Sequence, residues 1–433
     1  MSPEFIGIIG IIIMMVLMFT GMPIAFSMAL VGFIGFGYLT SINGSLFLLG
    51  DCFYFQFTSY TMLVIPLFVL MGQIAFYAGL SKKIFHTAYT WLGFIPGGLA
   101  IATIGACAGF SAICGSSTAT SATMGTVALP EMKKAHYDQA LATGTVAAGG
   151  TLGILIPPSI VLIIYGIQTE LSIGKLFIAG ILPGIILALI FTVCILVMCY
   201  FKPSIGFSAP KTSFKQKISS LTGTIDMILL FFLVMGGIVF GWFTPTEAAG
   251  VGAAGALVIA LIKRSLSWKN FKLALSDTTK TSAMVLLIIA CAMLFSRFLT
   301  VSGLPQGLAR WVGGLNTSPY VILACIMLIY VVGGCFMDAL SFLIITINIF
   351  FPIIVNAGFD PIWFGVIIVI LLETGAITPP VGINVYVIKG IAPETELHTI
   401  FKGIFPFLLM MLVGLVLLTA FPDLALFLPS LVR

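Results

Sequence analysis

Long runs of apolar residues, separated by short polar segments, dominate the chain from one end to the other. A helix needs about 20 predominantly apolar residues to cross the hydrocarbon core of a bilayer. Each run close to this length predicts one membrane-spanning helix. These runs cover residues 4–20, 22–40, 61–80, 138–166, 177–200, 224–243, 246–262, 281–300, 361–388 and 403–421.

Two further apolar stretches, 91–130 and 311–352, are each about twice as long as one span. Each predicts either two spans joined by a very tight turn or a re-entrant hairpin of two half-helices. Both alternatives return the chain to the side of the membrane from which it entered.

The composition agrees with a chain that lies largely in lipid. Hydrophobic residues make up 60% of the 433 positions and charged residues only 8%, and the mean hydropathy is +1.21. A soluble domain carries about 25% charged residues, so this chain lacks the polar side chains that a soluble surface requires. The composition therefore excludes a soluble domain, a disordered chain, a secreted disulfide scaffold and a nucleic-acid binder. It predicts an all-α polytopic membrane protein.

The basic residues predict the orientation of the spans. Fifteen of the 19 Lys and Arg side chains cluster in four places, and such clusters mark cytoplasmic loops. The clusters are Lys82, Lys83, Lys133 and Lys134; Lys202, Lys211, Lys215 and Lys217; Lys263, Arg264, Lys269, Lys272 and Lys280; and Lys389 with Lys402. With these residues in the cytoplasm, hairpin 91–130 opens to the cytoplasmic side, hairpin 311–352 opens to the outer side, and both termini lie outside.

The chain contains an internal repeat. Its two Pro-Pro pairs, 157–158 and 379–380, lie 222 positions apart, and Gly153 matches Gly375 at the same offset. Each copy reads as a span, a hairpin and a span broken at Gly-x-x-x-Pro-Pro, and the three spans between the copies invert the second one. Inverted repeats with broken helices are typical of secondary transporters whose site lies near the bilayer midplane. The alternative is an ancestral duplication that serves only packing.

The repeat divides the chain into five segments. They are 1–60, N-terminal scaffold helices; 61–166, the first repeat with hairpin 91–130 and broken helix 138–166; 167–280, further scaffold helices; 281–388, the second repeat with hairpin 311–352 and broken helix 361–388; and 389–433, a C-terminal helix.

A run rich in Gly, Ser and Thr, 109–121, occupies the middle of the first hairpin. Unwound backbone at membrane depth is tolerated only where it is buried in protein or lines a cavity. The hydroxyls of Ser116, Ser117 and Thr118 are hard oxygen ligands that suit Na⁺, and a helix that starts here presents N–H groups to an anion. We expect Na⁺ ligation from this run and substrate contacts from Ser111 and Ser116. The alternative is a small-residue face for helix packing.

Asp338 places a carboxylate at the centre of the second hairpin, close to Gly334. Ionisable residues inside a membrane are costly and are functional candidates by default. We predict that both residues help to bind Na⁺. Asp338 also suits the N-cap of a second half-helix, and the two roles are compatible.

The broken spans supply further oxygen ligands. Proline removes an N–H group and frees the carbonyl one turn earlier. Glu373 is a second acid within an apolar run, and Thr151 occupies its position in the other repeat. The predicted Na⁺ ligands in these spans are Gly149, Thr151, Gly153, Glu373, Thr374, Gly375 and Thr378. The alternative is a proline kink whose carbonyls are satisfied by neighbouring Ser or Thr.

Arg297 lies near the outer end of its span, where it either pairs with a substrate carboxylate or extends to the interface. No His and Cys residues have metal-ligand spacing, and neither a nucleotide-binding GxxxxGK[ST] motif nor a Ser/His/Asp set is present. We therefore expect no metal other than Na⁺ and no enzyme. An intramembrane enzyme that uses Asp338 and Glu373 is a remaining alternative, although these acids lack a nucleophile or base partner.

Five motifs in this order carry a resemblance to a known family. They are GMPIAF at 21–26, GSSTAT at 115–120, GILIPPS at 153–159, TPTEAAG at 244–250 and TPPVG at 378–382. The sequence resembles the large membrane subunit (DctM type) of tripartite ATP-independent periplasmic (TRAP) transporters, over essentially the whole chain.

The resemblance implies an elevator-type Na⁺ symporter for organic acids in the inner membrane of a bacterium. It also implies two partners, a separate small four-helix membrane subunit and a soluble periplasmic binding protein that delivers the substrate. Among substrate groups the chain looks most like the sialic-acid members. A C4-dicarboxylate subunit and a stand-alone ion-coupled permease of the dicarboxylate or arsenite type are the alternatives.

Overall fold

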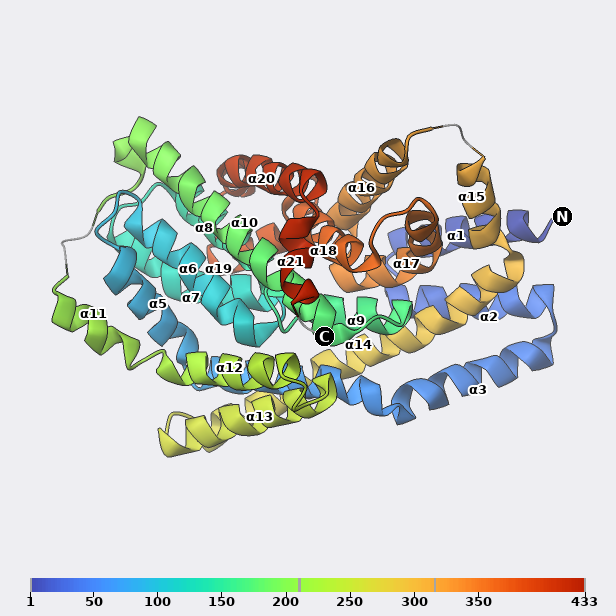
Figure 1. The fold of residues 1–433 in the computed structure, drawn as a ribbon, viewed down its shortest axis with the longest axis horizontal. Coiled ribbons are helices and arrows are strands. Elements are labelled where there is room, and N and C mark those ends of the chain that lie inside the picture. Colours follow the sequence, from blue (N-terminus) through green and yellow to red (C-terminus); the bar gives the residue numbers. More distant parts are fainter. Residues whose placement is uncertain (1, 209–211, 315–316, 432–433) are drawn as a thin grey trace.

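The computed structural model describes residues 2–208, 212–314 and 317–431, which fold into α-helices joined by short loops and 3-10 turns (Figure 1). The all-helical class is therefore confirmed. Within the described residues, seven helices are long and apolar enough to cross a membrane. Lys211, assigned above to a cytoplasmic loop, and residues 315–316 of the second hairpin lie outside the described residues.

The unbroken predicted spans all form helices. They are α1 (Pro3–Phe19), α2 (Ile24–Leu39), α4 (Val64–Tyr77, preceded by the 3-10 turn η1, Tyr60–Leu63), α10 (Ile173–Phe201), α12 (Ile225–Val239), α13 (Pro245–Ile262), α14 (Trp268–Ser302) and α20 (Leu397–Ala420). The expected start of α14 at residue 281 is wrong. Ser267 caps the helix, and its polar first turns precede the apolar run.

Five helices lie outside the predicted spans. They are α3 (Ile42–Thr58), α5 (Leu80–Leu92), α11 (Phe214–Leu221), α15 (Leu304–Gly313) and α21 (Asp423–Ser430). Polar residues interrupt their apolar runs, so a criterion of about 20 apolar residues misses them. The single C-terminal helix expected for 389–433 is accordingly wrong, because α21 follows α20 after a break at Phe421.

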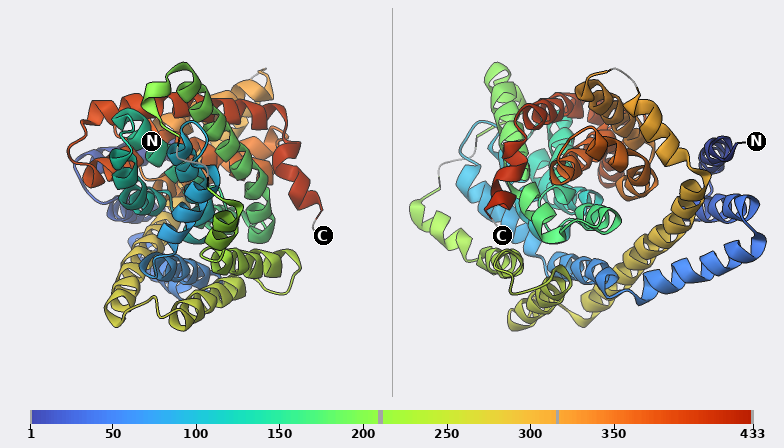
Figure 2. Two further views of the ribbon diagram at one scale, coloured as in Figure 1. Left: turned by 90° about the vertical axis from the view of Figure 1, so that its left-hand side faces the viewer. Right: turned by 45° about the vertical axis from the view of Figure 1, so that its right-hand side comes forward.

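α3 lies across the direction of the neighbouring spans. The right-hand view of Figure 2 looks nearly along the axis of α1, beside the label N, and the mid-blue α3 runs across it. The side chains of Phe47, Tyr54 and Phe57 on α3 are more than half exposed. Tyr is enriched at the membrane–water interface, and helices that lie in the interface direct Phe and other apolar side chains into the lipid. Since α3 joins the outer ends of α2 and α4, we infer that it lies along the outer membrane surface.

Each long apolar stretch forms two helices joined by a two-residue turn. The first hairpin consists of α6 (Gly98–Cys114) and α7 (Ser117–Lys134), and the second of α16 (Pro319–Phe336) and α17 (Ala339–Asn356). Gly115 in the first turn has φ +65°, and a Cβ there would lie 2.7 Å from the carbonyl oxygen of Pro158. Only glycine satisfies both the left-handed backbone and this close approach.

Both Pro-Pro spans are broken, as predicted. The first consists of α8 (Gln139–Gly150), the 3-10 turn η2 (Thr151–Ile154) and α9 (Ile160–Thr169), and the second of α18 (Pro361–Ile377) and α19 (Ile383–Ile391). Both Pro-Pro peptide bonds are cis. The order span, short helix, hairpin, broken span is therefore the same from α4 to α9 and from α14 to α19.

The helices pack in two groups. α2 and α4 pack on α14, α13 packs on α4, and α1 and α12 complete the group that we name the frame. α8 packs on α20, and α10 packs on α6, α9, α18 and α20, so these helices form the hairpin group together with both hairpins and broken spans. The predicted segments divide differently, because α4 and α14 belong to the frame and α10 belongs to the hairpin group. Gly180 on α10 permits this packing, since a Cβ there would lie 2.6 Å from the carbonyl oxygen of Leu155.

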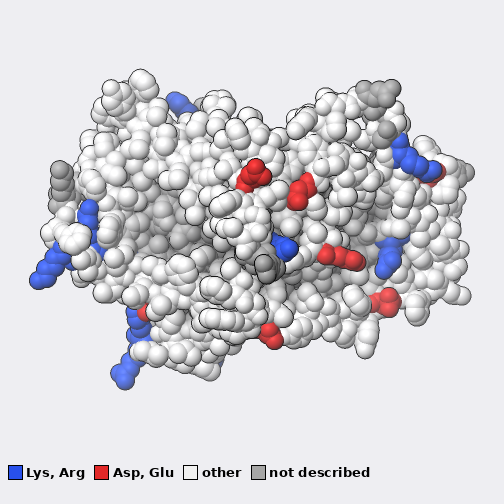
Figure 3. All heavy atoms as spheres, in the orientation of Figure 1, with Lys and Arg blue, Asp and Glu red and all other residues white. Residues whose placement is uncertain are grey.

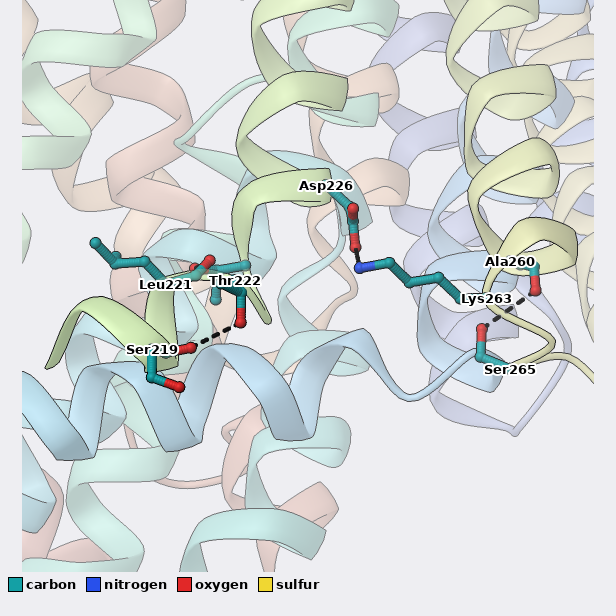
Figure 4. A network of polar contacts seen from close by, with 8 residues as sticks. Ser219, Leu221, Thr222, Asp226, Ala260, Lys263 and Ser265 are labelled. Atoms are coloured by element: carbon teal, nitrogen blue, oxygen red, sulfur yellow. Dashed lines mark hydrogen bonds and ion pairs between the residues drawn. The ribbon is translucent and has the colours of Figure 1, made fainter. Parts of the chain in front are cut away.

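Many charged side chains lie near the ends of helices or in the loops between them. Figure 3 shows a few separated charges on one face, with broad uncharged areas between them. At the end predicted to be cytoplasmic, Lys263 after α13 forms an ion pair with Asp226 in the first turn of α12 (Figure 4). Nearby on the same side, Lys133 donates a hydrogen bond of 2.8 Å to Glu394, which lowers the pKa of that exposed carboxyl group.

The contact between α8 and α20 generates a prediction about stability. A Cβ on Gly403 would overlap the carbonyl oxygen of Ala140, and a Cβ on Gly144 would overlap the backbone of Gly403. We expect Gly403→Ala to lower the free energy of unfolding by about 1–3 kcal/mol, because two backbones must separate. Thermal unfolding of the purified protein in detergent measures this. Gly50→Ala is the control, since nothing lies within 4 Å of its Cβ position, and equal melting temperatures for the two variants would contradict the prediction.

Candidate functional site

The turns of both hairpins line one cavity of about 430 Å³, which we name the tip cavity. Residues 114–119 and 338–340 form its hairpin side, and Gln73 on α4 and Thr281 on α14 contribute from the frame. Two turns 222 residues apart in the sequence thus meet at one place. The sequence candidates that line this cavity are Ser116, Ser117, Thr118 and Asp338.

Ser116 and Asp338 each cap the second helix of their hairpin. The Oγ atom of Ser116 accepts a hydrogen bond from the N–H of Ala119 at 3.4 Å. Oδ2 of Asp338 accepts hydrogen bonds from the N–H groups of Leu340 at 3.2 Å and Ser341 at 3.4 Å. The capping role considered for Asp338 is therefore present. Because both caps line the tip cavity, the positive ends of α7 and α17 lie there together. The carboxylate of Asp338 already meets the end of α17, whereas the end of α7 has a neutral cap and favours an anion.

The three candidates of the first broken span lie in the interior, and one of them touches the first turn. A Cβ on Gly153 would lie 2.6 Å from the carbonyl oxygen of Ser116, so η2 and the turn touch through their backbones. Gly149 packs in the same way on the side chain of Cys107. Thr151 donates its hydroxyl to a backbone carbonyl three residues earlier, at 2.6 Å. All three side-chain positions are buried.

The second broken span meets the second hairpin through two glycines. A Cβ on Gly375 would lie 2.5 Å from the carbonyl carbon of Gly334. Thr378 donates its N–H to the carbonyl of Gly375 at 3.0 Å and its hydroxyl to the carbonyl of Thr374 at 2.5 Å. A neighbouring Thr thus satisfies the carbonyls beside this proline break, as in the alternative interpretation above. Each carbonyl retains a second lone pair for another donor or a cation.

Glu373 is the most unusual group near the tip cavity. Its side chain is 1% exposed, and neither carboxylate oxygen has a hydrogen-bond partner among the described residues. The polar side chains nearest to its carboxyl group are those of Ser117, Asp338 and Asn384. Unpaired buried polar groups cost free energy and call for an explanation, such as an ion.

The sequence interpretation missed Asn384, and it did not single out Thr120 and Ser121 within the run 109–121. Asn384 is fully buried in the first turn of α19, and both polar atoms of its amide lack a partner within the described part of the chain. The hydroxyls of Thr120 and Ser121 on α7 are orphaned in the same way. The one available signal for Asn384 was an isolated amide in an apolar run directly after the second Pro-Pro pair. Together with Glu373, these residues supply the oxygen atoms that a hard cation requires.

Two predicted substrate contacts lie away from the tip cavity. Ser111 is fully buried within α6, and its hydroxyl donates to the carbonyl of Cys107 at 2.6 Å. Arg297 lines a different cavity of about 610 Å³, which we name the outer cavity, together with Gln56 and Glu170. Groups of three or more His, Cys, Asp or Glu side chains that could hold a metal ion are absent from the described residues.

Comparison with known proteins assigns the family. Residues 11–424 match the family model described as "Tripartite ATP-independent periplasmic transporter, DctM component". The chain belongs to this family. The resemblance carried by the five sequence motifs is therefore confirmed at the level of the family.

Relatives of this TRAP permease carry different substrate names. It is 39% identical to the C4-dicarboxylate TRAP transporter large permease protein DctM of Pseudomonas aeruginosa over 372 residues, 86% of each chain. It is 33% identical to the sialic acid TRAP transporter large permease protein SiaM of Vibrio cholerae over 422 residues, 96% of each chain. The fold is similar to that of the Alcanivorax borkumensis YdaH transporter, with a TM-score of 0.59 at 16% identity, over 89% of this chain and 90% of that one.

As a TRAP permease, the chain is a multi-pass protein of the bacterial inner membrane and a transporter subunit for an organic acid. It is not an enzyme, so Asp338 and Glu373 have no catalytic role to fill. Their burial near the two hairpin turns needs a reason connected with transport.

The glycine contact behind the second turn generates a prediction about transport. Gly375→Ala forces α18 and α16 apart close to Asp338, while most of the hairpin group keeps its packing. We expect organic-acid uptake by the reconstituted TRAP permease complex to fall on the order of tenfold, because small displacements of a site are costly. Gly390→Ala on α19 is the control, since its Cβ would meet open space. Equal uptake by both variants at equal protein levels would show that this contact does not position the site.

Proposed function

We propose that this permease couples the import of an organic acid to Na⁺, with the substrate in the tip cavity and Na⁺ at the oxygen atoms behind the two turns. The observation that carries the proposal is the convergence of both hairpin turns on one cavity. The N-terminus of α7, capped by the neutral side chain of Ser116, favours an anion there, whereas Asp338, the one charged residue among those that line the cavity, favours Na⁺. The unpaired oxygens of Glu373 and Ser121 are hard ligands of the kind that Na⁺ prefers.

The proposed movement is that of an elevator. The tip cavity lies between α4 and α14 of the frame and the turns of the hairpin group, so a displacement of the hairpin group carries the cavity with it. If the basic loops are cytoplasmic, the two hairpins enter from opposite sides and are re-entrant, with their turns near the midplane. Inverted repeats of this kind provide two equivalent states that open to opposite sides.

Coupling follows from linkage between the two ligands. Na⁺ near the turns raises the affinity for the acid, and the acid raises the affinity for Na⁺ by the same factor. Glu373 and Asp338 also make the movement of an empty carrier costly, because their charges are then uncompensated. A membrane potential that is negative inside adds about 2.3 kcal/mol per 100 mV for each net positive charge that moves inward with the acid.

The family description names a tripartite periplasmic transporter, which supports two partners for this chain. We propose a periplasmic binding protein that delivers the acid and a small membrane subunit that packs on the frame. The rival is the stand-alone ion-coupled permease considered in the sequence analysis.

For the substrate we propose a C4-dicarboxylate, because a relative that carries this name is 39% identical. Sialic acid, favoured by the sequence analysis, is the second candidate and is supported by the relative at 33% identity over 96% of the chain. Both candidates present a carboxylate to the tip cavity, so the mechanism is the same for either.

Reconstituted proteoliposomes test the function. We expect the complete transporter to accumulate succinate when an inward Na⁺ gradient and the binding protein are both present, and not to accumulate it when either is absent. Accumulation of N-acetylneuraminate instead would select the second candidate. Uptake by the permease alone, without binding protein or small subunit, would establish the stand-alone alternative and refute the tripartite one.

Substitutions near the turns test the ion sites. We expect Ser116→Ala, Asp338→Asn and Glu373→Gln to raise the half-saturating Na⁺ concentration of uptake by about tenfold each, the effect of losing one ligand to a charged partner. Glu131→Gln is the control, because this carboxyl group is exposed on α7 and pairs with Lys134. An unaltered Na⁺ response in all three variants would refute the proposed ligands.

A further inference from the structure

The outer cavity separates the frame from the hairpin group at a second place. The end of α3, the turn η1 and the last turns of α14 form its frame side. The end of α9 and the start of α10 form the opposite side. All these elements lie at the ends of their spans that face away from the basic loops. The outer cavity therefore lies on the periplasmic side.

The lining of the outer cavity is polar and carries unused hydrogen-bond donors. Arg297 forms no ion pair with any described residue. Gln56 is fully buried, and neither polar atom of its amide has a hydrogen-bond partner in the described chain. Hydroxyl groups of Ser59, Thr61 and Ser296 also line the cavity. A guanidinium group with neighbouring N–H and O–H donors has the chemistry that recognises a carboxylate.

One ridge of side chains on α14 connects the two cavities. Thr281 and Val285 line the tip cavity, and Ile289, Met293 and Arg297 line the outer cavity. Each of these positions is four residues from the next, so successive side chains are neighbours along a ridge that winds slowly around the helix. From Val285 to Arg297 the distance along the axis is about 18 Å.

α9 follows the same path on the opposite wall. Its first residues, Ile160 and Val161, line the tip cavity, and Ile167 near its end lines the outer cavity. The two cavities are therefore consecutive spaces along a single interface between the frame and the hairpin group. The side chains of Val161, in the lining of the tip cavity, and Ile289, in the lining of the outer cavity, are both buried in this conformation.

We propose that the outer cavity is a binding site for the carboxylate of the incoming organic acid, held by Arg297 and Gln56 before the acid reaches the tip cavity. The proposal rests on the proposed function, because it assigns a first stop to the same substrate on the way in. It also explains why an unpaired arginine and an unpaired buried amide line one space.

Glu170 gives the proposal a test of sign. This residue follows α9 with φ +57° and is the one carboxylate among the residues that line the outer cavity. Its charge opposes an anionic ligand, whereas that of Arg297 attracts it. Neutralising the two residues must therefore change the capture of substrate in opposite directions.

The measurement is uptake of succinate or N-acetylneuraminate, whichever the wild type transports, by the complete transporter at varied concentrations of loaded binding protein. Arg297→Gln is expected to raise the half-saturating concentration roughly fivefold to tenfold, with the maximal rate and Na⁺ dependence unchanged. Arg297→Lys keeps the positive charge, so its half-saturating concentration is expected to lie between those of the wild type and Arg297→Gln. Glu170→Gln is expected to lower the half-saturating concentration. Raising the ionic strength at constant Na⁺ is expected to weaken capture by the wild type more than by Arg297→Gln.

Gln56→Leu separates binding from folding. If the amide serves the substrate, this variant raises the half-saturating concentration but leaves the melting temperature unchanged or higher, because an unpaired buried polar group is removed. A lower melting temperature with unchanged capture would assign Gln56 a structural role and overturn its part in the site. The same half-saturating concentration in wild type, Arg297→Gln and Glu170→Gln would overturn the outer site. A wild type that transports neither acid would refute the proposed function, a different result from unaltered capture in a working transporter.

Discussion

The cost of removing oxygen atoms and charges from water is the constraint on which this structure depends. In lipid, every backbone N–H and C=O group must find a partner within the protein, and the chain meets this demand with helices. Where the helices break, the carbonyls and side chains gather at the interface between the hairpin group and the frame. Glu373, Asn384 and Ser121 are among the exceptions, because their buried polar atoms have no partner among the described residues. If Na⁺ binds there as we propose, these atoms become ligands, and the stability of the fold depends on the ion.

The same constraint explains the glycines around the turns. A helix that must stay close to a broken neighbour has to bring backbone against backbone, and Gly153 and Gly375 do this in the two repeats. Ser116 and Asp338 then cap α7 and α17 from within the tip cavity. Capping and ligand binding are therefore compatible at one residue, since a capping oxygen retains lone pairs for a cation. In the outer cavity, on the side predicted to be periplasmic, the proposed ligand is an anion, so the groups that would bind it are hydrogen-bond donors such as Arg297 and Gln56.

Much of the fold followed from the apolar pattern, because a membrane permits so few alternatives. The spans, both hairpins and the breaks at the Pro-Pro pairs were predictable from run length and proline chemistry. α3 and α5 were not predictable in this way, since polar residues interrupt their apolar runs. The packing of α10 within the hairpin group was not predictable either. A glycine such as Gly180 can indicate a close helix contact, but the sequence does not show which segment it contacts. Within the site, Asp338 and Glu373 stood out as acids in apolar runs, whereas a single amide such as Asn384 carries too weak a signal without its neighbours.

The central claim is that the oxygen atoms behind the hairpin turns bind Na⁺ in the folded permease. A titration of the thermal stability of the purified protein with NaCl, against KCl and choline chloride at equal ionic strength, tests this claim most directly. A ligand that binds only the folded state raises its stability by RT ln(1 + [L]/Kd). The account predicts a saturable increase in melting temperature with Na⁺ alone. The same response to all three salts, or none to any of them, would contradict it.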